Sequence, residues 1–352
     1  MAAENQPLVS VVMPVYNGEE FIADAIRSVQ AQTYSNWEMY IGNNWSKDGT
    51  LAIAEGFAAQ DPRIHVATYP KFVSVVESHN NAFGLVAPAA KYCKLISADD
   101  LLFPTCIEEM VKVAEAYPSV GMVVSYVLAG NHICSGFPYP TSFMSGRDVV
   151  RRKFLIDSSP LGGPSQSLIR ASILRERVPF YNPINYHGDI EAYLELLKTY
   201  DLGFVHQLLT FMRTGEASRT TSYLGRVQSR AASAMDELTK FGRFYLTEEE
   251  FVPRLRAATN AYYHFLGSNV WEFRSKEFWD YHLKHVKKLG YPPNYPRIAW
   301  AAFVRLLEMA GNPLRTLQGA ARRIRDRRAA KARRPAASHG PAPTTRASTA
   351  TR

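Results

Sequence analysis

Two adjacent carboxylates, Asp99 and Asp100, lie between two apolar runs in the segment "KLISADDLLFP". The run before them is typical of a buried strand, and burying a charge is costly unless the charge is paired or bound to a metal. Carboxylate oxygens suit a divalent cation such as Mg²⁺ or Mn²⁺, which can also hold phosphate oxygens. The pair therefore indicates a cation site. The structural alternative is that both acids cap the next helix, near whose first turn Pro104 lies.

Two other predicted strands also end in unusual polar groups. Pro14, Tyr16 and Asn17 follow the first strand, and Asn43 and Asn44 follow the second. In an open α/β sheet, ligands bind outside the carboxyl ends of the strands. An aromatic ring such as Tyr16 can stack on a base, and an amide such as Asn44 can pair with a base edge. A nucleotide diphosphate held through a cation would use all three strand ends.

The elements that must position these groups alternate between strand-like and helix-like patterns, as expected for an α/β sheet. Strands are predicted at 8–14, 37–42, 63–69, 92–97 and 120–130, and helices at 19–32, around 51–54, at 75–86 and at 103–117. From 130 to 219 the sequence is rich in Gly, Pro and Ser, which predicts loops apart from a helix at 188–200 and a strand at 203–213. From 223 to 314 the pattern is helical.

The net charge of +9 is concentrated near the end of the 352-residue chain. From Asn312 onward there are eleven Lys or Arg residues and one acid, Asp326, so the preceding residues are almost neutral. This distribution argues against a nucleic-acid-binding face on the folded body and predicts no nucleic-acid partner. Anionic lipid can attract such a basic segment. The alternative is a solvated terminal helix without a partner.

Composition predicts a globular protein without a membrane-spanning helix. No window of about twenty apolar residues is present, and no secretory signal follows Met1. The three cysteines, Cys93, Cys106 and Cys134, are set among apolar neighbours and are interpreted as reduced core thiols. The sequence predicts a cytoplasmic protein, or one held peripherally at the inner face of the plasma membrane by its basic segment.

Four segments, taken in order, resemble the family 2 glycosyltransferases over about the first 130 residues. They are "VSVVMPVYNGEEFIADAIRSVQAQTYSNWEMYIGNN", "SKDGTLAIAEGFAAQDPRIHV", "HNNAF" and "YCKLISADDLLFPT". The resemblance implies an α/β protein of the GT-A fold, a Rossmann-like mixed sheet flanked by helices, here with an α-helical C-terminal extension. It also implies a nucleotide-sugar donor, Mg²⁺ or Mn²⁺ as cofactor, and inverting transfer to a hydroxyl acceptor.

The resemblance also suggests a domain organisation. Residues 1–222 would form the GT-A domain, with a nucleotide-sugar-binding half at 1–130 and an acceptor half at 131–222. Residues 223–314 would form the helical extension, and residues 315–352 a basic helix and a disordered tail.

Site residues follow from the same resemblance. Asp100 would be the metal ligand, with Asp99 contacting the ribose or a metal-bound water. The nucleotide sugar would be bound by residues at the strand ends and nearby: Pro14, Tyr16, Asn17, Asn44, Asp48, Asn80, Asp99 and Arg213. Arg213 and Arg219 would belong to a basic segment over the donor, although a solvated loop is the alternative for both.

Two positions depart from the commonest family pattern. Asn43 and Asn44 replace two acids, and Ser97 replaces the first acid of the pattern after the fourth strand. Asn44 can still accept the N3–H of uracil through its side-chain carbonyl, so a UDP-linked donor is expected.

Asp189, in "NYHGDIEAYLELL", is the predicted general base. Its position ahead of an apolar-faced helix resembles the segment where the family carries that base. Helix N-capping is the alternative role, and Glu191 is the second candidate for the base.

These features together predict an inverting, metal-dependent glycosyltransferase in bacterial-type polysaccharide, glycolipid or glycan synthesis, with a glycan or glycolipid acceptor. One alternative is a non-catalytic nucleotide- or sugar-binding subunit of a glycan assembly complex. The other is a nucleotidyltransferase, but that would be expected to show a Gly-rich phosphate loop after the first strand, which "PVYNGEEF" lacks.

Overall fold

A computed structural model describes residues 6–134, 137–157, 160–185, 187–213, 225–288 and 293–311. The predicted basic helix and tail at 315–352 lie outside these described residues. The chain divides into two compact units, one within Met1–Tyr262 and Ser275–Pro293, and the other within Tyr263–Arg274 and Asn294–Arg352.

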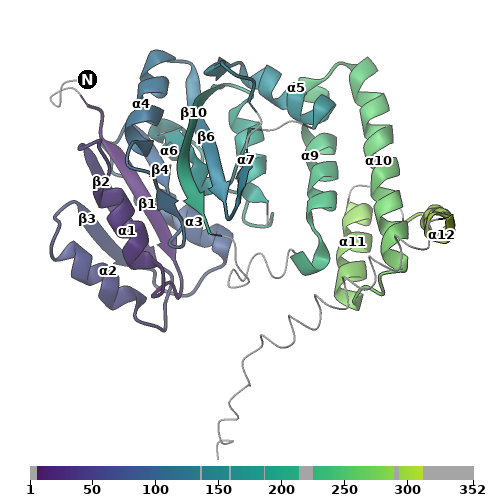
Figure 1. Ribbon diagram of the computed structural model, residues 1–352, viewed down its shortest axis with the longest axis horizontal. Coiled ribbons are helices and arrows are strands. Elements are labelled where there is room, and N and C mark those ends of the chain that lie inside the picture. The colour runs from purple at the N-terminus through teal and green to yellow at the C-terminus, as the bar shows by residue number, and fades with distance from the viewer. Residues whose placement is uncertain are drawn as a thin grey trace, which may run out of the picture. The chain divides into compact units, whose positions relative to one another are not determined.

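The first unit is built on a ten-stranded mixed sheet, shown in Figure 1. Its main strand order is β3-β2-β1-β4-β9-β6-β10-β5, with β7 paired to β6 and β8 paired to β10. The strands are β1 Val9–Val15, β2 Trp37–Asn43, β3 Ile64–Thr68, β4 Tyr92–Leu95, β5 Leu101–Leu102, β6 Val120–Ala129, β7 His132–Cys134, β8 Phe143–Met144, β9 Ser167–Arg170 and β10 Asp201–Met212. The predicted α/β class is confirmed.

Strand directions decide which loops meet at one edge of the sheet. β1, β2, β3 and β4 are mutually parallel, and β6 is parallel to β10. β9 is antiparallel to both of its neighbours, β4 and β6. The carboxyl ends of β1, β2, β4 and β6 therefore lie at the same edge as the amino end of β9. The loop that enters β9 thus belongs to the edge where a ligand site is expected.

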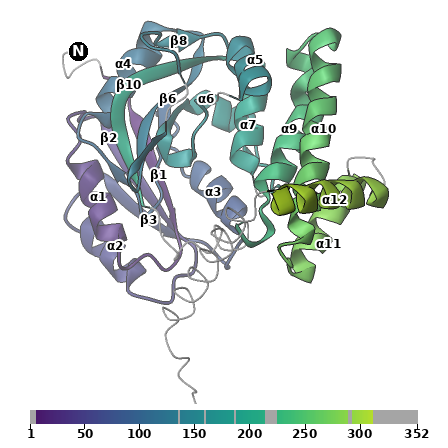
Figure 2. The same ribbon diagram turned by 45° about the vertical axis from the view of Figure 1, so that its right-hand side comes forward.

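Helices cover both faces of the sheet because side chains alternate along each strand. In β1, Val9, Val11 and Met13 pack with α1 Ile22–Gln30 and α4 Cys106–Ala116, whereas Val12 faces the opposite side. That opposite face is covered by α3 Val75–Phe83, α5 Gly146–Ile156, α6 Ala171–Glu176 and α7 Gly188–Leu196. α2 Thr50–Ala58 packs beside α1. Figure 2 shows the sheet and the helices on its two faces from a second direction.

The predicted helical region is confirmed by four helices: α9 Arg230–Tyr245, α10 Glu248–Val270, α11 Lys276–Lys288 and α12 Tyr295–Gly311. α10 begins at Glu248 and carries Pro253 inside it. In the first unit, α10 is joined to α5 by an ion pair between Arg151 and Glu250 (2.5 Å). Among the described helices, none combines the length and apolar character needed to cross a bilayer.

The prediction of loops between 130 and 219 was wrong at several places. The helices α5 and α6 and the strands β7, β8 and β9 lie there. β9 has only four residues and follows the Gly- and Pro-rich "LGGPSQ", so its sequence carries no period that reveals a strand. Its pairing on both sides makes it central to the sheet, which is a tertiary effect.

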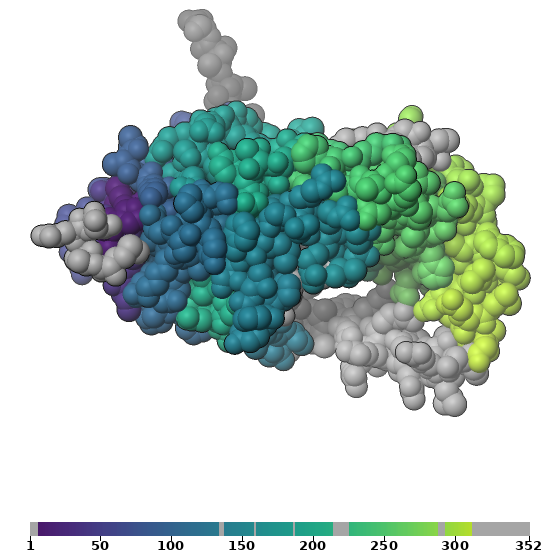
Figure 3. All heavy atoms as spheres, turned by 90° about the horizontal axis from the view of Figure 1, so that it is seen from above, coloured from purple at the N-terminus to yellow at the C-terminus, as the bar shows by residue number. Residues whose placement is uncertain are grey.

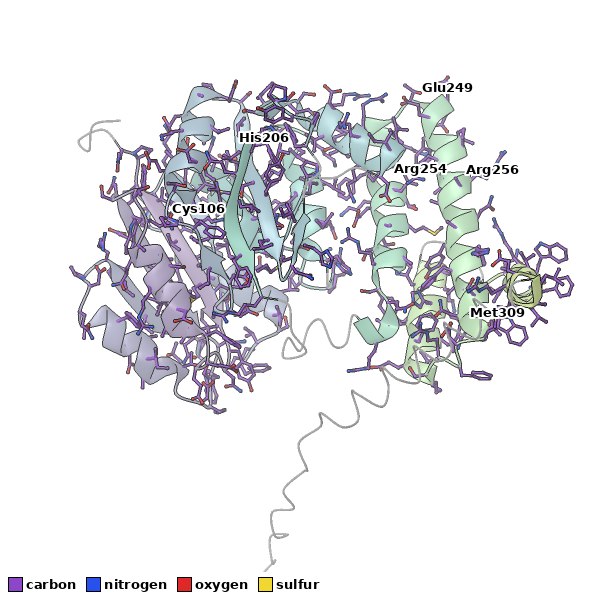
Figure 4. The ribbon with its side chains drawn as sticks, in the orientation of Figure 1. Cys106, His206, Glu249, Arg254, Arg256 and Met309 are labelled. Carbon is purple, nitrogen blue, oxygen red and sulfur yellow. The ribbon has the colours of Figure 1, made fainter. Side chains whose placement is uncertain are left out.

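The interpretation of the cysteines is confirmed for two of them. Cys93 and Cys106 are buried and free, and Figure 4 labels Cys106 at the start of α4. The side chain of Cys134 lies outside the described part of the structure.

Replacing Ile169 in β9 by Ala tests the central place of this strand. Ile169 is 2% exposed and lies in the core beneath α5 and α6. We expect the free energy of unfolding, measured by urea titration, to fall by about 2–4 kcal/mol, because a buried cavity remains. The matched change Ile184→Ala, at a side chain that is 80% exposed, should have little effect. Equal losses for both variants would contradict a buried β9.

Candidate nucleotide and cation site

The three polar strand ends singled out in the sequence meet at one edge of the sheet. Val15 is in register with Asn43, and the backbone N–H of Asn44 donates to the Val15 carbonyl (2.8 Å). β4 runs parallel to β1 on its other side, so the turn that carries Asp99 and Asp100 leaves the sheet at the same edge. Pro14 is in register with Gly42, one residue inside the edge.

The turns after β1 and β2 are held together by hydrogen bonds. Asn17, which has a positive φ of 51°, donates from its backbone to Ser46 Oγ (3.0 Å) and accepts from the Lys47 backbone N–H (2.8 Å). Asp48 accepts from the backbone N–H groups of Glu19 (3.2 Å) and Thr50 (3.1 Å). Burial raises the pKa of Asp48, but these bonds and one from the Thr50 hydroxyl together hold it below its ordinary value. Asn17 and Asp48 therefore shape the turns of the candidate site.

The predicted base-contacting amide, Asn44, is only 3% exposed and both of its polar atoms have partners. Its Nδ2 donates to the Val73 carbonyl (3.0 Å), and its Oδ1 accepts from the Val73 backbone N–H (2.9 Å). The neighbouring Asn43 bonds to Thr68 Oγ1 (3.2 Å) and the Ser46 backbone (3.1 Å). Asn44 thus fastens the loop after β3 to the end of β2, and a direct contact with a base stays a prediction.

That loop brings aromatic side chains to the predicted base-binding end. The Phe72 ring lies 4.8 Å from the Tyr16 ring, centroid to centroid, and Phe72 is 55% exposed. Trp45 is also exposed and donates from Nε1 to the Tyr69 carbonyl (2.7 Å), and Lys47 Nζ lies 4.7 Å from the centroid of the Trp45 ring. Sequence reasoning missed Phe72, for which the only signal was an aromatic residue in the short segment "YPKFV".

Trp45 has a positive φ of 62°, which is unusual for a bulky residue. Its indole hydrogen bond to the Tyr69 carbonyl helps to hold this backbone geometry. Strained backbone of this kind is often found at functional sites.

Asp100 is buried, with only 4% of its surface exposed, whereas Asp99 is partly exposed. Burial raises the pKa of Asp100 to about 6, and the Asp99 carboxylate adds to this effect. Hydrogen bonds from the Ser165 side chain and the Arg213 backbone act in the opposite direction but do not outweigh it. The Asp100 carboxylate is thus incompletely neutralised by its surroundings, and a cation beside it would favour its charged form.

Asp99 and Asp100 fit a divalent cation, but they supply only part of the set of ligands that such a cation needs. Within the described ranges, no three His, Cys, Asp or Glu side chains gather into a complete metal site. Asp100 and Asp99 offer carboxylate oxygens at one turn, and Mg²⁺ is commonly bound by one or two carboxylates together with substrate phosphates. A cation at this turn would therefore need phosphate or water to complete its ligands.

Lys94 was missed by sequence reasoning, although a lysine within the apolar "YCKLIS" was a visible signal. It is fully buried, and its ammonium donates to the carbonyls of Ser165 (2.5 Å) and Ser167 (3.3 Å). The Ser97 backbone N–H donates to Ser165 Oγ (3.0 Å), and the two hydroxyls of these serines are 3.2 Å apart. Lys94 and Ser97 thus hold the loop entering β9 against the turn of Asp99 and Asp100.

Arg213 contacts Asp100 through its backbone rather than its side chain. Its guanidinium lies 4.8 Å from the centroid of the Phe21 ring and 3.4 Å from Asp24 Oδ2. The predicted contact between the Arg213 side chain and the donor stays a prediction. Arg219 lies outside the described residues.

Asp189 is the second residue of α7, and its side chain is partly exposed. Burial lowers the pKa of His79 in α3 and of His187, and the nearby carboxylate of Asp189 opposes that effect at both. Asp189 therefore lies near His79 of α3 and near His187. By contrast, the Glu191 carboxylate is buried and accepts hydrogen bonds from Asn182, Asn185 and Lys240.

Asn80 of α3, predicted to bind the nucleotide sugar, holds the backbone of the segment between α6 and α7. Its side-chain amide donates to the Tyr181 carbonyl and accepts from the Tyr181 backbone N–H, both at 2.8 Å. The Tyr181 hydroxyl lies 3.3 Å from that of Tyr193, which lies 3.2 Å from Ser167 Oγ. A buried chain of hydroxyl groups thus leads from the Asp189 side of the site to the loop held by Lys94.

Solved structures share the fold of this protein. S. aureus TarS 1–349 in complex with UDP-GlcNAc aligns with a TM-score of 0.59 and 12% identity, over 85% of this chain and 88% of that chain. The mannosyltransferase PcManGT from Pyrobaculum calidifontis, in complex with GDP-Man and Mn²⁺, aligns with a TM-score of 0.53 and 16% identity, over 87% and 89%. The fold is that of the GT-A glycosyltransferases.

Sequence comparison finds similarity to one family. Residues 10–177 match the model described as glycosyl transferase family 2. An uncharacterized glycosyltransferase of Rickettsia typhi is 27% identical over 250 residues, which is 70% of this chain and 74% of that protein. This segment of the chain is thus similar to the family 2 glycosyltransferases, as its motifs suggested.

Two further relatives are matched over smaller parts. An uncharacterized protein of Sinorhizobium fredii is 34% identical over 34% of this chain, and an uncharacterized glycosyltransferase of Haemophilus influenzae is 35% identical over 35% of it. The chain spans only 13% and 38%, respectively, of the lengths of these proteins.

Stability should depend on pH through Asp100. Because its pKa is higher in the folded protein than the ordinary 3.8, the folded state binds more protons between pH 3.8 and about 6, and stability falls as pH rises across that window. With chelator present, Asp100→Asn should raise the free energy of unfolding by about 2–3 kcal/mol near pH 8 and by much less near pH 4. Urea titrations at the two pH values measure this.

The control for this prediction is Asp280→Asn, at an exposed helix position where Asp280 pairs with Lys276. It should leave both stabilities nearly unchanged. A loss of stability in Asp100→Asn near pH 8 would show that the buried carboxylate is compensated by its surroundings.

Proposed function

We propose that this protein is an inverting, divalent-cation-dependent glycosyltransferase that moves a sugar from a UDP-linked donor to a hydroxyl group of a glycan or glycolipid. The observation that carries the proposal is Asp100, a buried carboxylate with a raised pKa at the carboxyl end of β4. It lies at the same sheet edge as the Tyr16 and Phe72 rings, as expected for a nucleotide diphosphate bound between a cation and a base-stacking surface.

In this proposal the donor lies along the edge of the sheet. Asp100 and Asp99 would hold Mg²⁺ or Mn²⁺, and Asp99 would also approach the ribose. Tyr16 and Phe72 contact the base, with Pro14, Asn17, Asn44 and Asp48 shaping the pocket around it. UDP and UDP-GlcNAc bound to TarS support a uridine donor, although PcManGT was solved with GDP-Man.

Asp189 acts as the general base. It takes the proton of the acceptor hydroxyl as the oxygen attacks the anomeric carbon from the face opposite the diphosphate, which inverts the configuration. Glu191 is less suited to this role, because its carboxylate is buried and bound to Lys240. The Asn80 amide holds the Tyr181 backbone, and this contact fixes the loop that precedes Asp189.

The leaving diphosphate must be stabilised as its bond to the sugar breaks. When bound, the cation supplies positive charge to the diphosphate oxygens. Asp99 and Asp100 set the place of that charge, and the Arg213 backbone N–H holds Asp100 in its orientation. The Arg213 guanidinium would have to leave Asp24 and Phe21 to reach the diphosphate.

Within this proposal, residues 1–222 carry donor and acceptor binding, and residues 223–314 extend the domain. The protein acts in the cytoplasm in bacterial-type polysaccharide or glycan synthesis. The basic residues beyond 315 bring it to the anionic inner face of the plasma membrane, where lipid-linked acceptors are found.

Two substitutions separate donor binding from transfer. Asp100→Ala should abolish Mn²⁺-dependent binding of UDP, measured by isothermal titration, because the buried metal ligand is lost. Asp189→Asn should keep that binding and lower UDP release from UDP-GlcNAc or another accepted UDP-sugar by about 100-fold or more, because proton transfer is lost. Glu195→Gln, on the same helix as Asp189 and paired with Lys198, is the matched control and should change neither quantity.

Different failures lead to different conclusions. If a panel of nucleoside diphosphates shows no cation-dependent binding, the donor site is wrong. If binding occurs without hydrolysis or transfer, a non-catalytic subunit is favoured, as the departures at Asn43 and Ser97 would allow. Transfer at the parent rate by Asp189→Asn would exclude Asp189 as the base.

A further inference from the structure

The helix α12 is firmly packed in the second unit through one face only. Ile298, Ala301 and Ala302 are buried, and a Cβ added to Gly267 of α10 would lie 2.5 Å from the Ala301 Cβ. Trp271 Nε1 donates to the Ala302 carbonyl (2.7 Å). The inner face of α12 is therefore fully used in packing.

The outer face of α12 is apolar and exposed. Trp300 is 66% exposed, Phe303 47% and Leu307 55%, and their spacing places them on one side of the helix. The Trp300 and Phe303 ring centroids are 5.8 Å apart. The same side carries further exposed apolar residues: Pro296, Ala299, Leu306 and Ala310. We call the exposed set Trp300, Phe303, Leu306 and Leu307 the outer stripe.

The charged residues of α12 lie away from the outer stripe. Arg305 pairs with Glu308 at 2.9 Å, Glu308 also approaches His264 of α10 at 3.9 Å, and the Arg297 guanidinium lies 4.6 Å from the centroid of the Tyr263 ring. A helix at a protein surface ordinarily turns polar residues outward. Contiguous exposed apolar surface of this kind marks an interaction site.

Figure 3 shows the spheres of α12, at the yellow end of the colour range, at the surface of the molecule. Figure 4 views α12 nearly along its axis, with ring side chains projecting from it and Met309 labelled. Within the described residues, no hydrogen bond, ion pair or ring contact joins the outer stripe to another helix.

We propose that the outer stripe is a docking surface for an anionic lipid bilayer, with Trp300, Phe303 and Leu307 inserted at the level of the headgroups. The chain itself argues for this partner, because the sequence from Asn312 onward carries eleven Lys or Arg residues and one acid. An apolar helix face and an adjoining basic segment are the two signals that together give stable binding to anionic membranes. The proposal does not depend on transferase activity.

A second copy of the chain is a less suitable occupant of the outer stripe. It would cover the apolar side chains but leave the positive charge of residues 312–352 uncompensated, and two such segments in one dimer repel each other. An anionic bilayer satisfies the apolar face and the basic segment at once. Trp and Phe are also suited to the interface between headgroups and acyl chains.

Co-sedimentation of the full-length protein with vesicles tests the proposal. Binding to vesicles of phosphatidylcholine and phosphatidylglycerol should be strong at low salt, weaker at high salt, and weaker still with phosphatidylcholine alone. The double variant Trp300→Ser, Phe303→Ser should bind anionic vesicles with an affinity at least about tenfold lower than that of the parent protein, because apolar area is lost. The control Ile133→Ser, at a 60% exposed side chain in β7 of the first unit, should bind like the parent protein.

A conservative variant guards against misfolding of the double variant. Vesicles that contain brominated lipid should quench Trp emission in the parent protein, and Trp300→Phe should lose most of that quenching while it still sediments with the vesicles. The matched change Trp279→Phe, at a half-buried side chain in α11, should retain the quenching.

Two results would overturn the proposal. One is unchanged vesicle binding by the double variant together with unchanged quenching in Trp300→Phe. The other is a parent protein that binds no vesicles but self-associates with rising concentration in sedimentation velocity, with this self-association lost in the double variant. That result would make a second copy of the chain the occupant of the outer stripe. Hydrolysis of a UDP-sugar should be equal in the parent and all these variants, so failure here is distinct from failure of the proposed activity.

Discussion

The arrangement of the site depends on one buried cation, the ammonium group of Lys94. It is fully enclosed and bonded to two carbonyls of the loop that enters β9, and the Asp100 carboxylate nearby also favours its charged form. Burial lowers the pKa of Lys94, because an enclosed ammonium group loses its hydration. The same loop is tied to Ser97 on one side and, through Ser167, to Tyr193 of α7 on the other. β4, the loop before β9 and α7 are thus linked by the hydrogen bonds of Lys94 and of the serines beside it.

Several polar residues that looked like ligand contacts in the sequence form the framework of the site. The Asn44 and Asn80 amides each make a pair of hydrogen bonds to one backbone residue, Val73 and Tyr181 respectively, which imitates the pairing of adjacent strands. Such contacts satisfy backbone groups of loops that would otherwise lack partners. An amide can both donate and accept, whereas a carboxylate can only accept. This gives a physical reason for asparagine at position 44, where family members commonly carry an acid.

Sequence reasoning predicted the β1 to β4 half well because its signals are local. The apolar run of β1, the spacing of Ile22, Ala25, Ile26 and Val29 in α1, and the polar residues at the strand ends all survive in the structure. β9 could not be predicted, since four residues carry no usable period and its place depends on pairing with two distant strands. The partners of Asn44, Lys94 and Phe72 were equally inaccessible, because each lies in a different element or loop, as far as 73 residues away in the sequence. The places of the candidate site residues along the fold could be predicted from the sequence, whereas their hydrogen-bond and packing partners could not.

The reversed direction of β9 has a consequence for how such a protein can diversify. Because β9 runs against its neighbours, its entry loop, with Gly163 and Ser165, faces the site, and its exit leads into α6 at the opposite edge. The parallel strands that present Tyr16, Asn44 and Asp100 are separate from this loop along the chain. Under the proposed function, insertions ahead of Gly163 would therefore remodel the acceptor side, while Ser165 and Ser167 keep their contacts with Lys94, Ser97 and Asp100. A change of acceptor would then require neither a new cation site nor a new base pocket.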